Sequence, residues 1–244
     1  MIPRHLVYGC VLTWSLIAQA GAGVIMDQIG PNSTFQQGLS NNRTQISNFY
    51  ASAPQFDISV TDDFLVSDRA TVDNVEAAIF ASNSMHGFAN LSALRVNIFS
   101  APPTATGFSA GDLLSVDIPV ANVAFTAPWT LDPLTRLAKI DLSNKGVLLD
   151  PGTYWLSVVA INNSFSTDIG VLMSSFSGAP GNENARQVGS GLWGGGGNLS
   201  LNADAAYRIS ATAVPEPSTL LLGCVSLALL AYRRDGINEQ ASVR

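Results

Sequence analysis

The sequence reads Leu114-Ser115-Val116-Asp117-Ile118-Pro119-Val120 near its centre, and the alternation of apolar and polar residues in this stretch decides the fold class. Successive side chains of an extended strand point to opposite faces, so the pattern predicts a strand with one buried and one solvated face. The same period recurs through the middle of the chain, in residues 70–80, 94–98, 137–142, 154–158, 169–173 and 207–212.

Turn-forming residues divide these alternating runs. Asp150-Pro151-Gly152 predicts a tight turn into a strand that begins at Thr153-Tyr154-Trp155. Residues 101–112 predict a long connection between two strands, and the glycine-rich residues 178–197 predict a loop. Short strands separated by turns predict an all-β fold, an antiparallel β-sandwich of about eight to ten strands, as in a jelly roll. We expect this domain to cover residues 21–213, with Trp155 in its core.

The composition favours an exported β-protein and excludes several functions. Charged residues make up 12% of the chain, against roughly 25% in ordinary soluble proteins. Between the two terminal apolar runs there are 8 basic and 16 acidic residues, which give a net charge of −8. Such a surface repels phosphate backbones, so no nucleic-acid partner is expected. Cys10 and Cys224 both lie in the terminal runs, and the middle therefore has no disulfide, thiol nucleophile or cysteine metal site.

The amino-terminal segment has the three parts of a secretory signal peptide. Arg4 precedes the short apolar run 6–17, and Ala18-Gln19-Ala20 places small residues at the −3 and −1 positions of a cleavage site. As a helix the run would be about 18 Å long, too short to cross a bilayer core of about 30 Å. We predict a signal peptide over residues 1–20, cleaved after Ala20 or, as the alternative, after Ala22.

The carboxy-terminal segment combines a stiff peptide with an apolar helix. The prolines of Val214-Pro215-Glu216-Pro217 hold this peptide extended, because their φ is fixed near −65°. Residues 220–232 are almost wholly apolar, and Arg233-Arg234 follow them at once. Arginines after an apolar run favour the cytoplasmic side of a membrane. We therefore predict a transmembrane helix, an exported domain before it and a cytoplasmic tail over residues 235–244.

This order of motif, apolar helix and arginine pair resembles the PEP-CTERM sorting signal, over residues 214–234. The resemblance implies brief retention in the inner membrane, until a membrane-embedded exosortase cuts near Pro-Glu-Pro and the product passes to the cell surface or extracellular matrix. The sorting residues that it implies are Val214, Pro215, Glu216, Pro217, Arg233 and Arg234. The alternative is a plain anchor that no enzyme processes.

The middle segment offers few groups for catalysis or metal binding. His86 is its only histidine and lies in no nucleophile-elbow motif, so neither a Ser-His-Asp triad nor a zinc site is predicted. Asp57, Asp62 and Asp63 are weak candidates for a structural calcium, which binds carboxylate and carbonyl oxygens, although they form no EF-hand loop. We expect no other cofactor and no enzymatic activity.

Two tryptophans are the candidate ligand-binding residues. Trp129 and Trp193 lie in predicted loops, where an indole ring can stack on a sugar. Residues 62–64, 95–99 and 149–155 also resemble, loosely, jelly-roll modules of the carbohydrate-binding kind. We expect a non-enzymatic surface or matrix protein that associates with an extracellular polysaccharide or a matrix protein. Two alternatives stay open, a secreted glycoside hydrolase that uses a pair of carboxylates and a purely structural envelope protein.

Overall fold

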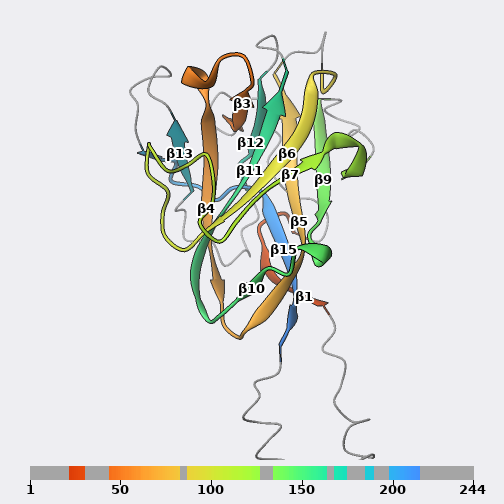
Figure 1. The fold of residues 1–244 in the computed structure, drawn as a ribbon, viewed down its shortest axis with the longest axis vertical. Helices are drawn as coiled ribbons and strands as arrows, with labels where there is room; N and C mark the ends of the chain where they lie inside the picture. Colours follow the sequence, from red (N-terminus) through yellow and green to blue (C-terminus); the bar gives the residue numbers. More distant parts are fainter. Residues whose placement is uncertain are drawn as a thin grey trace, which may run out of the picture. The chain divides into compact units, whose positions relative to one another are not determined.

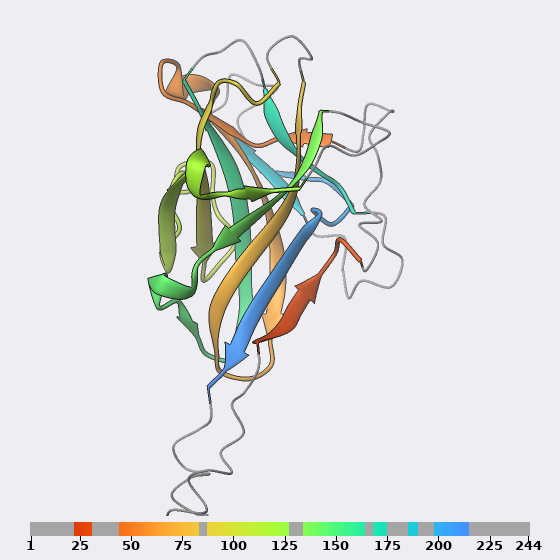
Figure 2. The same ribbon diagram turned by 90° about the vertical axis from the view of Figure 1, so that its right-hand side faces the viewer.

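Strands make up most of the regular structure in the computed structural model, which describes residues 22–30, 44–82, 87–126, 134–163, 168–174, 185–189 and 198–214. The unit Ala22–Thr212 consists of two β-sheets that enclose one main apolar core (Figures 1 and 2). The predicted all-β sandwich is therefore confirmed. The predicted signal helix over residues 1–20 lies outside the described residues, as do all residues of the predicted sorting segment after Val214.

The first sheet, which we call sheet A, is centred on the long strand β5. Its main order is β1-β15-β5-β12-β2, and β9 and β10 also pair with β5 while β8 pairs with β9. Its strands are β1 (Ala22–Asp27), β2 (Thr44–Ile46), β5 (Ala70–Ala81), β8 (Ala124–Phe125), β9 (Thr135–Asp141), β10 (Leu148–Leu149), β12 (Ile169–Leu172) and β15 (Tyr207–Ala213).

The second sheet, sheet B, has the order β14-β13-β4-β3-β11-β6-β7, and β4 also pairs directly with β11. Its strands are β3 (Asn48–Tyr50), β4 (Ile58–Val66), β6 (Leu91–Phe99), β7 (Leu114–Pro119), β11 (Gly152–Asn162), β13 (Arg186–Gly189) and β14 (Asn198–Ser200). Three single-turn 3-10 helices lie in connections: η1 (Pro54–Phe56), η2 (Val120–Asn122) and η3 (Ser143–Lys145).

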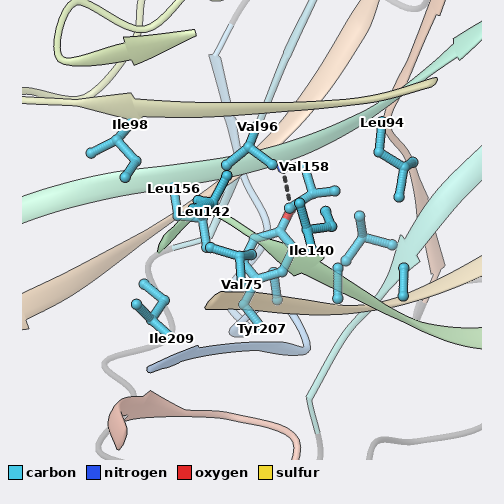
Figure 3. Close-up of a cluster of buried hydrophobic side chains, with 14 of the residues drawn as sticks. Val75, Leu94, Val96, Ile98, Ile140, Leu142, Leu156, Val158, Tyr207 and Ile209 are labelled. Atoms are coloured by element: carbon cyan, nitrogen blue, oxygen red, sulfur yellow. Dashed lines mark hydrogen bonds between the residues drawn. The ribbon is translucent and has the colours of Figure 1, made fainter. Parts of the chain in front are cut away.

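Alternate apolar residues of the two sheets fill the space between them (Figure 3). Val75, Ile140 and Tyr207 come from sheet A, and Val96 and Val158 come from sheet B; all five are at most 1% exposed. Burying one such side chain stabilises the fold by about 1.5–3 kcal/mol. The period of two in the sequence is thus the direct cause of the layered core, because it gives each long strand one apolar face.

Several short strands were not predicted from the sequence. The short strands β8, β10 and β13 display no clear alternation of their own, and they form because a neighbouring strand supplies their hydrogen bonds. Within residues 178–197, which the sequence predicts to be rich in loops, the structure adds the short strand β13, which pairs with β4. One pairing also departs from the antiparallel expectation, because β3 runs parallel to β11.

Ser47 carries the chain from sheet A to sheet B between β2 and β3. Its backbone N–H donates to the Ile169 carbonyl in sheet A (3.1 Å), and its carbonyl accepts the Ala160 N–H of sheet B (3.0 Å). Its hydroxyl donates to the Val158 carbonyl (2.8 Å) and accepts the Val60 N–H (3.2 Å). This buried serine therefore has every polar group paired while the chain changes sheets.

Candidate functional site

The carboxy-terminal strand β15 leads directly into the predicted sorting motif. Tyr207, Ile209 and Ala211 are buried, whereas Arg208 and Ser210 between them are partly exposed. The strand ends at Ala213, so only Val214 separates it from the first proline of the motif. In the sequence, the Pro-Glu-Pro peptide therefore follows the last strand of the sandwich after a single residue.

Charged side chains on the outer face of sheet A hold β15 in place. The Arg208 guanidinium contacts the Asp27 carboxylate of β1 (Nε–Oδ1, 3.1 Å) and the Glu76 carboxylate of β5 (Nη1–Oε2, 2.8 Å). It also donates to the Gly30 carbonyl (2.7 Å), and Lys139 of β9 contacts Glu76 from the other side (3.7 Å). Arginine suits this place because its planar fork can serve several acceptors at once.

The first strand of the domain lies beside the last one. β1 pairs antiparallel with β15, with Ala22 opposite Thr212 and Val24 opposite Ser210. The Thr212 hydroxyl donates to the Asp73 carboxylate of β5 (2.7 Å), which fixes the same end of β15. The start of β1 and the end of β15 therefore lie side by side, at the lower end of the sandwich in Figures 1 and 2.

This end of the sandwich, which we call the proximal end, also carries the turn Ser67–Arg69 between β4 and β5. The strand ends farthest from that turn form the distal end. They include Ile58 at the start of β4 and Phe80 near the end of β5. Strand partners extend the distal end, because Gly189 pairs with Ile58 and Thr135 pairs with Phe80.

The candidate ligand-binding tryptophans themselves lie outside the described residues, but the strands that flank them are described. Trp129 belongs to the connection that ends at β9, and Trp193 belongs to the one that leaves β13. β9 begins at Thr135 and β13 ends at Gly189, and both residues are at the distal end. The two connections thus adjoin strands at the same end of the sandwich, although β9 is in sheet A and β13 is in sheet B.

His86 and the cleavage-site residues Ala18 and Ala20 also lie outside the described residues.

The three aspartates of the calcium hypothesis do not share a site. Asp62 is fully buried and its carboxylate accepts the backbone N–H groups of Ala205 (2.7 Å) and Asp63 (3.0 Å). Asp57 accepts the Tyr50 N–H (2.8 Å) at the distal end of sheet B. Adjacent residues of a strand point to opposite faces, which separates Asp62 from Asp63. Within the described ranges no three His, Cys, Asp or Glu residues are grouped as metal ligands.

Burial changes the acidity of these carboxyl groups. Desolvation raises the pKa of Asp62 well above its usual range, and the hydrogen bond from Ala205 only partly opposes this shift. Desolvation also raises the pKa of Asp57, against the hydrogen bond from Tyr50 and the charge of Arg95. Asp62 therefore acts as a buried acceptor that ties β4 of sheet B to the segment before β15.

The outer face of sheet B is covered by the connection between β6 and β7, which the sequence predicted only as a long connection. Phe108 from this connection packs edge-on against Phe49 of β3, with 5.9 Å between ring centroids. Arg95 lies over the same Phe49 ring at 5.5 Å and forms a bidentate pair with Asp117 (2.6 and 2.9 Å). These contacts make a second small apolar cluster, which no local sequence signal identifies.

Trp155 lies on this outer face and not in the core between the sheets. It is only 6% exposed, as predicted for a buried residue, and the Arg186 guanidinium stacks over its ring at 5.0 Å. Its neighbours Tyr154 and Leu156 pack against the main core, so alternation directs the Trp155 ring outward. The predicted burial of Trp155 is confirmed, and its ring lies outside the main cluster between the sheets.

Comparison with known proteins identifies the carboxy-terminal segment alone. A family model described as the PEP-CTERM protein-sorting motif matches residues 213–234. The match begins at the last residue of β15, so the structural end of the domain and the start of the signal coincide. No curated protein matches the chain.

The described residues include no helix with the length and apolar character needed to cross a membrane. The predicted transmembrane helix would lie in residues 214–234, beyond the part that the structure describes except for Val214. The sorting residues Pro215, Glu216, Pro217, Arg233 and Arg234 all fall within the matched family model. The chain therefore carries a PEP-CTERM protein-sorting motif at residues 213–234, which implies an exported protein that is sorted by an exosortase.

Proposed function

We propose that this exported domain is a non-enzymatic surface or matrix protein that binds a neutral or cationic polysaccharide, or another matrix protein, at its distal end. The observation that carries the proposal is that different parts of the chain adjoin the two ends of the sandwich. β1 and β15 leave it at the proximal end, whereas the connections that contain Trp129 and Trp193 flank strands at the distal end. The strand ends that flank these connections are therefore at the opposite end of the sandwich from the start of β1 and the end of β15.

Charge and side-chain chemistry support the proposed ligand class. The net charge of −8 between the apolar runs disfavours anionic polymers. An indole ring combines a large apolar face with an N–H donor, which suits contact with a sugar. When a sugar binds to the ring, it gives up contacts with water that are about as favourable as the contacts that it gains. The affinity of a single copy of the domain for the polysaccharide should therefore be low. Many copies on one surface would raise the effective concentration and provide retention.

The environment of Asp62 supports a non-enzymatic role. A glycoside hydrolase needs two carboxyl groups about 5–10 Å apart on either side of an accessible sugar. Asp62 is the carboxyl with the most strongly raised pKa among the described residues, yet it is fully buried and bonded to backbone N–H groups. Its raised pKa therefore follows from a structural position, and no substrate could reach it without unfolding.

Two tryptophan variants test the proposed binding. Trp129→Ala and Trp193→Ala should each lower retention on purified host matrix while the melting temperature stays close to that of the parent. Leu65→Ala is the matched control, because Leu65 is apolar, 65% exposed and close to the proximal end. Parental binding by both tryptophan variants would refute the distal site. Unfolding of both would assign the two rings a structural role.

A further inference from the structure

The two halves of β1 are held in the sandwich very differently. Met26 is buried in the main core and Asp27 is bound to Arg208, so the second half is anchored. Ala22, Gly23 and Val24 are all exposed, with Val24 at 56%. A break in register separates the halves, between Val24 and Met26. The first half therefore adheres to the domain almost wholly through its pairing with β15.

This first half covers the part of β15 that is closest to the sorting motif. Ala22, Gly23 and Val24 lie opposite Thr212, Ala211 and Ser210 in the antiparallel register. In the described chain β1 is the edge strand of sheet A beyond β15. Detaching residues 22–24 would consequently expose the backbone hydrogen-bonding groups of residues 210–212 and leave the core intact.

The Pro-Glu-Pro motif itself offers a partner few backbone hydrogen-bond donors. Pro215 and Pro217 have no backbone N–H, so Glu216 is the only donor between them. An enzyme that binds its substrate as an added strand obtains affinity from main-chain hydrogen bonds. The nearest regular donors on the amino side of the motif belong to β15 and Val214, and Ala213 to Pro215 spans at most about 7 Å.

We infer that the exosortase binds the folded domain itself, by pairing with the end of β15 in place of residues 22–24 of β1. This inference rests on the sorting role of the carboxy-terminal signal. The docking surface is the edge of Ser210–Val214, and its occupant is an extended strand or groove of the processing enzyme. Opening of the first half of β1 precedes cleavage, so the strength of the β1–β15 pairing controls the rate of processing.

A reversible cross-link across the two strands tests the inference in the full chain. Val24 and Ser210 are direct partners, and such antiparallel pairs satisfy the Cα separation that a disulfide requires. Val24→Cys with Ser210→Cys, in a chain that also carries Cys10→Ala and Cys224→Ala, would close this pairing when oxidised. A closed disulfide keeps the two strands from separating, so we expect release of the carboxy-terminal peptide to slow by about tenfold or more.

The matched control places the same cross-link where β15 is not involved. Leu148→Cys with Thr71→Cys joins β10 to β5, which are also direct antiparallel partners near the proximal end. Its oxidised form should be processed at the rate of the cysteine-free parent, and reduction should restore processing of the Val24–Ser210 pair. Processing of the oxidised Val24–Ser210 protein at the parental rate, with its disulfide intact, would overturn the inference.

A variant without a cross-link gives an independent reading. Gly23→Val should strengthen the β1 pairing, because valine favours strands and a Cβ at Gly23 meets nothing within 4 Å. We expect slower release of the carboxy-terminal peptide with an unchanged amino terminus. Equal or faster release of this peptide would contradict the inference that β1 controls the rate of processing. If the cysteine-free parent itself is never processed, the sorting role fails, and this outcome is distinct from failure of the β15 docking surface.

Discussion

Tyr207 connects the two sheets through a hydroxyl group that is completely buried. The hydroxyl accepts the Val158 N–H (3.3 Å, Figure 3) and donates to the Val60 carbonyl (3.1 Å), and both of these residues are in sheet B. Burial raises the pKa of Tyr207 above its usual range, so the group stays protonated and can donate. One side chain of β15 therefore satisfies two backbone groups in the opposite layer.

Tyr207→Phe should lower the free energy of unfolding by about 1–3 kcal/mol, because it leaves the buried Val158 N–H without its partner. Denaturant unfolding of the two proteins measures this difference. Tyr154→Phe is the control, since the Tyr154 hydroxyl donates to the Asp150 carbonyl at an exposed position. Removal of that bond should change stability by roughly 0.5 kcal/mol or less. Equal effects of the two variants would contradict the inter-sheet role of Tyr207.

Asp62 makes the stability of the folded domain depend on pH. Its pKa in the folded protein is raised, mainly by desolvation, so the folded state holds the proton more tightly than the unfolded state. The stability that this group contributes is therefore full below the unfolded pKa, about 3.9, and decreases as the pH rises toward the folded pKa. Above the folded pKa the contribution is constant.

Asp62→Asn removes this titration and keeps an oxygen that can accept the Ala205 N–H. The difference in unfolding free energy, variant minus parent, should rise with pH above about 4 and then level off. Asp57 also has a raised pKa, but it is present in both proteins and its effect cancels. Denaturant unfolding across this pH range checks the prediction. A difference that does not vary with pH would show that Asp62 is not protonated in the fold.

At the scale of elements, the connection between β6 and β7 is part of the packed structure. Phe108 is 5% exposed and belongs to the cluster with Phe49, Val159 and Val188 on the outer face of sheet B. The Arg95 guanidinium donates to the Ser109 carbonyl (3.1 Å), which fixes the chain next to Phe108. The connection therefore shields this face of the sheet from water.

Phe108→Ala should destabilise the domain by about 3 kcal/mol, the lower end of the range for losing a buried phenylalanine, because the cluster is small. Leu113→Ala in the same connection should change stability by roughly 0.5 kcal/mol or less, since Leu113 is 46% exposed. Thermal unfolding of both variants makes the comparison. A minor effect of Phe108→Ala would mean that the connection does not cover sheet B in solution.

At the scale of the whole molecule, the sandwich should fold without its terminal segments. A chain of residues 21–213 retains both sheets and contains no cysteine. Far-ultraviolet circular dichroism should show a β-rich spectrum, and a strongly helical one would refute the fold. The melting temperature should be unaffected by a chelator. A large decrease would instead support a bound calcium ion, because a ligand of the folded state stabilises it.

Processing of the full chain gives a second prediction at this scale. The surface-located protein should begin at Gly21 or Gly23, and mass spectrometry should find no peptide beyond Leu220. Both cuts would then lie close to the paired ends of β1 and β15, which bound the described domain. Recovery of residues 235–244 in the surface fraction would favour a plain anchor that is not processed.

The sequence by itself predicted the fold class, the sorting signal and most of the long strands, although β4 was not among the predicted runs. The alternating runs became β5, β6, β7, β9, β11, β12 and β15, because a period of two is a local property of the chain. The Pro-Glu-Pro motif, apolar run and arginine pair are contiguous, so they also need no tertiary information.

Only the tertiary structure decided which residues meet across long separations. Asp62 is buried because β4 meets the segment before β15, and Arg208 is the centre of an ion-pair network because β15 lies between β1 and β5. The pairing of Ala22 with Thr212 also depends on such contacts, as does the position at the distal end of Thr135 and Gly189, which flank the two tryptophan connections. Strand partners and sheet order depend on non-local contacts, which the period of a single strand does not encode.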